Sequence, residues 1–307
     1  MPRAGPVAGA HNRGVTATRG TVAEWAVMQL LKRLIQSVVL EPRVERAIDS
    51  LPVKTNALGF DSWGFSPEAS KLYYSLAWRI YQYFRPEIHG VENIPEGRVL
   101  IVPNHSGQLP FDGLVIAVAC LLEASPPRLV RAMVERWFPT LPVVSSAFTR
   151  SGAVLGDPIN CRNLLEADNA ILVFPEGARG SGKTWDHRYR LVKFGRGFMR
   201  LALQSSAPIV PVAVIGGEES IVSLYNIDGL ARLLHAPYAP VSPLLPLLGP
   251  LAYLPLPVKF HVYFGEPMLF SGPFDDEDEA IEHKVQQVSE RVQTMINEGL
   301  ARRESVF

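Results

Sequence analysis

Short apolar runs alternate with amphipathic stretches from about residue 88 to the end of the chain. Residues Val99–Val102 are apolar without a break, which is typical of a strand that is buried on both faces of a parallel sheet. Leu114–Leu122 has the character of a helix. In the same way we predict further strands at 129–134, 170–174, 209–215 and 258–264, and further helices at 162–166, 198–203 and from about Asp275 onward.

This alternation predicts an α/β fold over residues 88–307, with a mostly parallel sheet flanked by helices. Ligands of such sheets bind at the carboxyl ends of the strands. The loops that follow 99–102 and 170–174 are therefore expected to face one crevice.

Two amphipathic helices are predicted ahead of this domain, within residues 21–87. The first follows the capping box Thr21-Val-Ala-Glu24 and runs to about Leu40. The second begins at Ser66-Pro67 and interleaves aromatic with basic side chains. That pattern is typical of a membrane–water interface, but a helix packed on the core has it too. Residues 1–20 lack the apolar stretch of a signal peptide and are expected to form a disordered tail.

Residues Ala236–Val258 contain seven prolines and no charged side chain. Proline at every third or fourth position favours an extended, polyproline-like path over a helix. The segment is expected either to pack on the body of the protein as a loop or to form an apolar lip that dips into lipid.

Charge and composition narrow the choice of partners. Thirty basic residues balance thirty acidic ones, which argues against nucleic-acid binding. The first forty residues, however, carry five basic side chains and one acidic one, which suits an anionic lipid surface. No apolar run is long and helical enough to suggest a spanning helix. We therefore expect a peripheral, membrane-associated protein on the cytoplasmic face, with membrane lipid as its partner.

The first candidate for chemistry is Asn104-His105, which follows the predicted strand Val99–Val102, with Asp112 seven residues after the histidine. A histidine oriented by a carboxylate is the usual base for removing a proton from a hydroxyl group. A histidine that merely forms a hydrogen bond within a turn would leave the same pattern.

The second candidate is Phe174-Pro-Glu176-Gly177-Ala-Arg179-Gly180, directly after the strand 170–174. Glycines allow backbone N–H groups to approach an anion, and an arginine can hold phosphate or carbonyl oxygens with two hydrogen bonds. A third motif, Pro208-Ile-Val-Pro211-Val, opens the next strand and could form a wall of the crevice.

These three motifs, in this order, resemble the lysophosphatidate acyltransferase-like superfamily of glycerolipid acyltransferases, over about residues 88–215. The resemblance implies transfer of a fatty acyl chain from acyl-CoA or acyl carrier protein, as co-substrate, to a lipid hydroxyl, without a metal or another cofactor. It implies His105 as the base and Asp112 as the group that orients it. Substrate contacts are expected from Asn104, Glu176, Gly177 and Arg179.

The chain departs from the family pattern in two places. Six residues, not four, separate His105 from Asp112, so the intervening segment must bulge. Pro158 stands where the family usually has an arginine that contacts the acceptor, and Arg162 or Arg196 could substitute for it. The resemblance favours a lysophospholipid acceptor, and the missing arginine leaves a mono- or diacylglycerol as the alternative.

Two other classes of protein fit parts of the sequence. Gly177 to Thr184 matches the phosphate-binding pattern G-x-x-x-x-G-K-T, which requires a helix that begins at the Lys-Thr pair. No apolar period follows Thr184, so we expect Lys183 to lie on a solvated loop instead. The remaining alternative is a lipid-binding protein without catalytic activity.

Overall fold

The computed structural model describes residues 39–136, 138, 143–227, 229, 231 and 238–307. The predicted tail over residues 1–20 lies outside the described residues, as does nearly all of the predicted helix over 21–40. Residues 40–307 form one compact unit, so the sequence from 40 to 87 belongs to the same body as the sheet.

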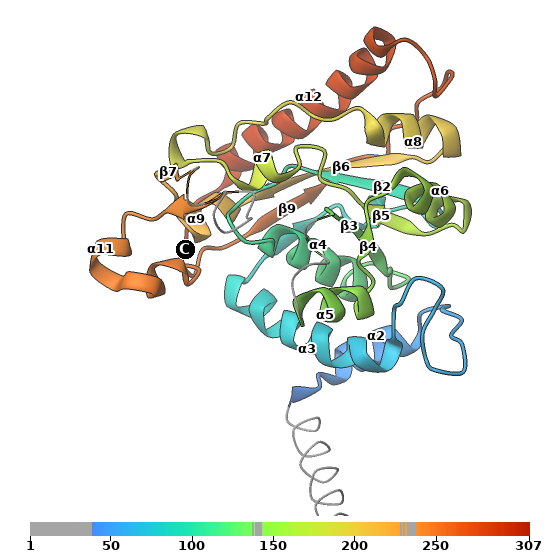
Figure 1. The fold of residues 1–307 in the computed structure, drawn as a ribbon, viewed down its shortest axis with the longest axis horizontal. Helices are drawn as coiled ribbons and strands as arrows, with labels where there is room; N and C mark the ends of the chain where they lie inside the picture. The colour runs from blue at the N-terminus through green and yellow to red at the C-terminus, as the bar shows by residue number, and fades with distance from the viewer. Residues whose placement is uncertain (1–38, 137, 139–142, 228, 230, 232–237) are drawn as a thin grey trace, which may run out of the picture. The chain divides into compact units, whose positions relative to one another are not determined.

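The centre of this body is a seven-stranded sheet with the order β1-β9-β6-β2-β5-β3-β4 (Figure 1). All neighbouring strands are parallel except β6 and β9, so the predicted mostly parallel α/β fold is confirmed. In sheet order the strands are β1 Glu87–His89, β9 His261–Phe264, β6 Ile209–Ile215, β2 Val99–Pro103, β5 Ala170–Leu172, β3 Val130–Val134 and β4 Val154–Leu155.

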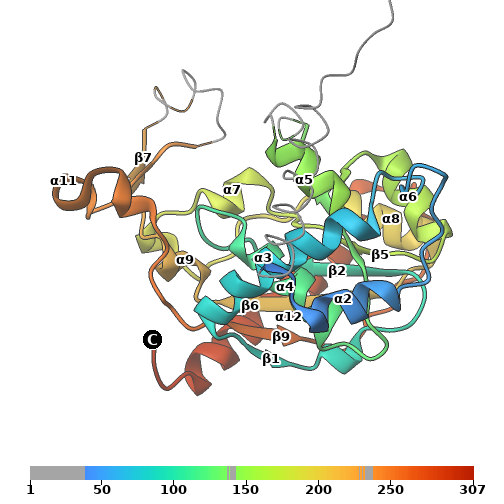
Figure 2. The ribbon, with the colours of Figure 1, turned by 90° about the horizontal axis from the view of Figure 1, so that it is seen from below.

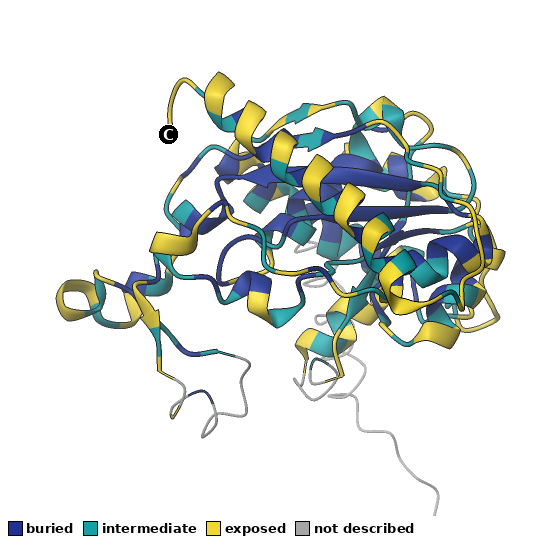
Figure 3. Ribbon diagram, turned by 90° about the horizontal axis from the view of Figure 1, so that it is seen from above, coloured by how far each residue is buried: buried dark blue, intermediate teal, exposed yellow. Residues whose placement is uncertain are grey.

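Helices cover both faces of the sheet (Figures 1 and 2). Alternate residues of β2 show this directly: Val99 and Ile101 pack against α2, α3 and α4, whereas Leu100 and Val102 pack in the cluster that includes α6, α8 and α12. Figure 3 shows α12 with its exposed residues on the outer side and buried strands beneath it. The bounds are α2 Pro42–Asp49, α3 Pro67–Phe84, α4 Phe111–Leu122, α6 Pro158–Glu166, α8 Gly197–Ser205 and α12 Asp278–Arg302.

The aromatic helix predicted after Ser66 is α3, and it packs on the core. The Ser66 hydroxyl accepts a hydrogen bond from the Ala69 N–H at 3.4 Å and caps the helix. Tyr74, Tyr81 and Phe84 are buried against α2 and α4. Their aromatic character therefore serves packing. Among the described residues, no helix is both long and apolar enough to span a membrane.

The proline-rich segment is not extended throughout, so that prediction is wrong for residues 245–253. Two short helical elements, α11 Leu245–Leu248 and η4 Gly249–Tyr253, occupy this stretch. Pro246 and Pro250 each lie in the first turn, where proline costs a helix no hydrogen bond. Before them, β7 Tyr225–Asn226 pairs with β8 Pro240–Val241 in a separate two-stranded sheet.

Candidate active site

Asn104 fixes the direction in which the chain leaves β2. Its side-chain amide donates to the Val214 carbonyl at 3.0 Å and accepts from the Val214 N–H at 2.7 Å. The Asn104 backbone N–H also donates to the Val212 carbonyl of β6 at 3.4 Å, so the pairing with β6 continues past the end of β2. Because its amide is fully buried and occupied in this way, the geometry gives Asn104 a positioning role instead of the expected substrate contact.

His105 lies immediately beyond Asn104 and is paired with Asp112 across the bulged segment. The His105 Nδ1 lies 2.6 Å from Asp112 Oδ2. The same carboxylate accepts hydrogen bonds from the backbone N–H groups of Ser106 and Gly113, at 2.8 and 2.7 Å. The longer spacing is accommodated by Gly107, whose φ of +83° lies in the left-handed region. The predicted pair is thus brought together despite the two additional residues.

Asp112 lies in the first turn of α4, where the helix dipole attracts a negative side chain. Burial opposes a positive charge on His105, but the Asp112 carboxylate, and behind it Glu176, outweigh the burial. The pKa of His105 therefore lies above its ordinary value. Since a carboxylate can only accept, Nδ1 carries the proton and Nε2 is left to accept one.

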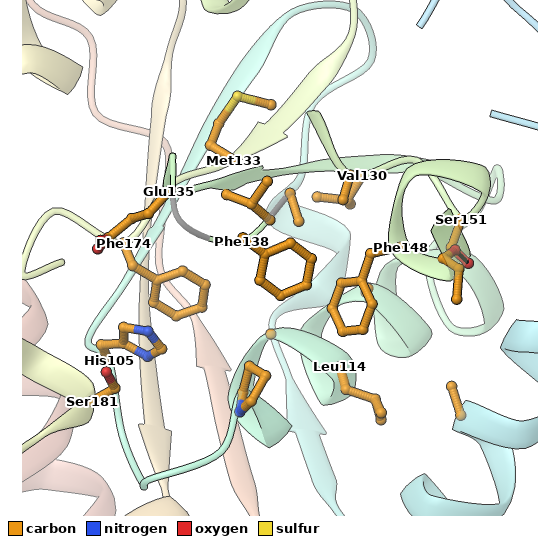
Figure 4. A pocket seen from close by; sticks show the side chains of 18 of the residues that line it. His105, Leu114, Val130, Met133, Glu135, Phe138, Phe148, Ser151, Phe174 and Ser181 are labelled. Carbon is orange, nitrogen blue, oxygen red and sulfur yellow. Dashed lines mark hydrogen bonds between the residues drawn. The ribbon is translucent and has the colours of Figure 1, made fainter. Parts of the chain in front are cut away.

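The ring of Phe174 packs against the face of the His105 imidazole (Figure 4). The two rings are stacked, with 4.2 Å between their centroids. Phe174 lies two residues after the end of β5, so both groups come from the carboxyl ends of adjacent parallel strands. This is where the alternation of elements predicts a ligand crevice.

The Glu176 carboxylate joins the two motif loops. It accepts a hydrogen bond from the His105 backbone N–H at 2.8 Å and one from the Val192 N–H at 2.7 Å. A Cβ on Gly180 would lie 2.5 Å from Glu176 Cβ and 2.8 Å from His105 Cβ, so only glycine allows this approach. Glu176 is buried and its oxygens are used within the protein. The expected contact with an acceptor therefore does not fit, and its place is to position His105.

Lys183 does not lie on a solvated loop, and that prediction is wrong. Its ammonium group is buried between Glu176 and Glu218, at 3.4 Å from each carboxylate, and 3.3 Å from the Arg190 carbonyl. Its own carbonyl accepts a hydrogen bond from Gln108 at 2.9 Å. Two buried carboxylates require a cation, and Lys183 supplies it.

The same arrangement argues against nucleotide binding by this loop. The helix α7 Ala178–Ser181 ends before the lysine, and Thr184 is followed by the short 3₁₀ turn η3 Trp185–His187. A phosphate-binding loop requires a helix that begins at the Lys-Thr pair and a lysine that is available to phosphate. Neither condition is met.

An apolar cavity of about 410 Å³ opens beside His105. Figure 4 shows His105 and Phe174 at one end and Phe148 and Ser151 further along. Its walls come from α3, α4, β3 and α5 Val144–Arg150, with Glu135 contributing an acidic group. The apolar residues that line it include Tyr73, Leu76, Ala77, Ile80, Leu114, Ala117, Val118, Val130, Ala132, Met133, Phe138, Ala147 and Ala153.

The glycine-rich loop borders this cavity but offers few free N–H groups. Gly177 lines the cavity, yet its N–H donates to the Phe174 carbonyl at 3.0 Å. The N–H of the next residue, Ala178, donates to Glu135 at 2.9 Å. We therefore do not assign oxyanion stabilisation to either group.

The three candidate arginines are not equivalent. Arg179, on α7, is exposed and makes no hydrogen bond or ion pair with any residue that the structure describes. Arg162 lies 3.8 Å from Glu166 on its own helix. Arg196 is held by Asp278 at 2.6 Å. Neither Arg162 nor Arg196 lines the cavity, so the structure does not place them with His105.

Comparison with known proteins finds a family model and several relatives. The family model described as Acyltransferase matches residues 85–215, which carry both motif loops. A protein of Mycobacterium tuberculosis, named only as uncharacterised, is 38% identical over 260 residues, which cover 82% of this chain and 73% of that protein. The chain belongs to the acyltransferase family.

More distant relatives of this acyltransferase have animal sources. A mouse protein named "DGAT1/2-independent enzyme synthesizing storage lipids" is 26% identical over 212 residues, which cover 69% of this chain and 59% of that protein. Among solved structures, the 1-acyl-sn-glycerophosphate (LPA) acyltransferase PlsC of Thermotoga maritima matches with 17% identity and a TM-score of 0.48. The match covers 78% of this chain and 80% of that one.

Three residues of the site were not anticipated from the sequence. Phe174 was noted only as part of a motif, whereas its ring forms the side of the histidine pocket. Lys183 was assigned to solvent, and Glu218 was not considered. The signal that could have found Glu218 is its place three residues after the end of an uninterrupted apolar strand, where a carboxylate lies near the carboxyl ends of the sheet.

Proposed function

We propose that this acyltransferase moves a fatty acyl chain from a thioester donor, acyl-CoA or acyl carrier protein, to a hydroxyl group of a glycerolipid. The observation that carries the proposal is the His105–Asp112 pair at the end of an apolar cavity. A base without the cavity would suit many reactions. A cavity without the base would suit a lipid-binding protein.

The proposed reaction uses the free nitrogen of the imidazole. Asp112 keeps the proton on Nδ1, so Nε2 takes the proton of the acceptor hydroxyl as its oxygen attacks the thioester carbonyl. The C–O bond forms, the C–S bond breaks, and the leaving thiolate receives the proton from the imidazolium. The carboxylate of Asp112 stabilises the charged imidazolium between these two steps.

The cavity is proposed to hold an acyl chain. Its walls are almost entirely aliphatic and aromatic, and a buried methylene group gains about 0.8 kcal/mol. Because His105 lies at one end, a chain bound along the cavity would place its carboxyl carbon near the base.

For the acceptor lipid, we now rank a mono- or diacylglycerol ahead of a lysophospholipid. Arg162 and Arg196 do not line the cavity and each has a carboxylate partner, which removes two of the three cations expected to hold a phosphate. Our first candidate is therefore a mono- or diacylglycerol, in line with the name of the mouse relative. The unpaired guanidinium of Arg179 supports a lysophospholipid as the second candidate.

We also propose peripheral attachment to the cytoplasmic face of a membrane. The uncharged segment that contains α11 and η4 exposes Leu247, Leu251 and Leu254. Shallow insertion of exposed leucines anchors a protein reversibly. Exchange of long-chain lipids with the cavity requires such an approach to the lipid surface.

The test is a panel of acceptors with purified protein, liposomes and radiolabelled acyl-CoA. We expect labelled triacylglycerol or diacylglycerol, and the label should disappear when the glyceride is omitted. Labelling of lysophosphatidate alone would replace our first candidate by the second. Failure to label any lipid from acyl-CoA or from acyl carrier protein would contradict the enzymatic proposal in favour of lipid binding.

A further inference from the structure

Three potential metal ligands meet at the edge of the sheet, on β1 and β9. Glu87 is the register partner of His261, and His89 lies two residues further along the same strand face. Their ligand atoms all lie within 4.8 Å of one another. The Glu87 carboxylate lies 3.3 Å from His261 Nδ1 and 3.9 Å from His89 Nε2. Figure 2 shows the two strands side by side at this edge.

His261 is the unusual member of this cluster. Only 6% of the residue is exposed, yet neither ring nitrogen forms a hydrogen bond with any described residue. A buried polar group without a hydrogen bond is costly, and a bound ion is one of its recognised explanations.

The spacing needs little adjustment to hold a cation. Tetrahedral zinc with bonds of about 2.1 Å places its ligand atoms about 3.4 Å apart. The contact between Glu87 and His261 already has this length. The Nε2 of the half-exposed His89, whose ring stacks on Tyr263, lies 3.9 Å from the same carboxylate oxygen. Two imidazoles with one carboxylate form a ligand set that zinc uses in proteins, with a fourth position open to water.

One cation already competes for this carboxylate. The Lys259 ammonium group forms an ion pair with the other oxygen of Glu87. The ion pair is solvent-accessible on both sides, so a divalent ion can displace the lysine. Arg303, the other cation near His261, is engaged by Glu219 at 2.6 Å.

We propose that Glu87, His89 and His261 form a zinc-binding site that ties the edge strand β1 to β9. The site is separate from the His105 pair and does not depend on the proposed acyl transfer. Its role is to stabilise the edge of the sheet, because a metal that binds only the folded chain raises the stability of that state.

The test is calorimetric titration of the full, tag-free chain with Zn²⁺, together with its melting temperature. We expect one Zn²⁺ per chain, a raised melting temperature, and a Kd that is at least tenfold weaker in His89→Ala and in Glu87→Gln. Both side chains are about half exposed, so these variants should fold. His187→Ala is the matched control, because His187 also lies beside a carboxylate, Asp186, at 3.0 Å but outside the cluster.

The variant Lys259→Met is expected to raise the affinity for Zn²⁺, whereas the two ligand variants lower it. Removing the ammonium frees the Glu87 carboxylate and takes a repelling charge away from the site, so Zn²⁺ should bind severalfold more tightly. A wild-type chain that takes up no Zn²⁺ at micromolar concentration would overturn the proposal. So would equal affinity of the wild type, His89→Ala and Glu87→Gln, since the ion would then be bound elsewhere.

Discussion

The Glu176 carboxylate accepts a hydrogen bond from the backbone N–H of His105 at 2.8 Å, so the second motif holds the proposed base of the first. The ammonium group of Lys183 lies between this carboxylate and that of Glu218 and offsets part of their negative charge. These contacts connect the loops that follow β2, β5 and β6. Substitution of Lys183 should therefore affect catalysis although its side chain does not contact a substrate.

Lys183→Met tests this support. It leaves two buried carboxylates without a cation, so we expect the free energy of unfolding to fall by about 3–5 kcal/mol. Because Lys183 lowers the pKa of His105, its loss should also move the acid limb of the activity profile to higher pH. Denaturant titration and the pH dependence of kcat/KM measure both effects.

The matched control is Lys193→Met. Lys193 also pairs with a glutamate, Glu282, at 2.8 Å, but its side chain is exposed. Exposed ion pairs contribute little to the free energy of unfolding, so this variant should be as stable as the wild type. Equal stability of the two variants would show that the buried lysine does not support the loops.

Much of the fold could be predicted because its signals are local. The uninterrupted apolar run at β2 and the Ser66-Pro67 start of α3 each lie within a few residues, and both elements formed where expected. The environment of Lys183 could not be predicted, because Glu218 is distant in sequence and reaches it only once β6 lies beside β2.

The site likewise combines features that local sequence signals predict with contacts that only the folded chain shows. The family resemblance implies the pair of His105 and Asp112 although their spacing departs from the family pattern, but it could not show which polar groups face a ligand. Asn104 and Glu176 have the residue types of substrate contacts, and only the folded chain shows that Val214, His105 and their other partners already occupy them. In the proline-rich segment the error came from treating each proline as a helix breaker regardless of its position.

Asp112→Asn should lower kcat by about 10²–10⁴-fold, because the imidazolium loses its counter-ion and Nδ1 its defined acceptor. The carboxylate raises the pKa of His105 against the effect of burial. Its removal should therefore lower this pKa and move the acid limb of kcat/KM to lower pH, opposite to Lys183→Met. A wild-type rate with an unshifted profile would remove Asp112 from the mechanism.

Ala117→Phe should shorten the preferred acyl chain. Ala117 lines the apolar cavity from α4, and a phenyl ring there takes up space that the chain is proposed to fill. The measurement is kcat/KM for a series of acyl-CoA donors of increasing length. Ala167→Phe, at an exposed position beyond α6 and outside the cavity, serves as the control and should keep the wild-type preference. An unchanged preference in Ala117→Phe would place the acyl chain elsewhere.

Leu247→Asp should reduce the fraction of protein that floats with anionic liposomes by severalfold. The substitution introduces charge into the uncharged segment that we propose inserts into lipid. Leu58→Asp is a close control, because Leu58 is 82% exposed and Leu247 81%, but Leu58 lies in the loop between α2 and α3. Equal flotation of both variants and the wild type would show that α11 does not contact the membrane.

The most direct test of the catalytic proposal is kcat/KM for acyl transfer by His105→Ala, with His187→Ala as the control. General base catalysis contributes about 10²–10⁴-fold, so we predict a loss of that size in His105→Ala, with an unchanged circular dichroism spectrum, and wild-type activity in the control. Near-wild-type turnover by folded His105→Ala protein would contradict the proposal that this histidine is the base.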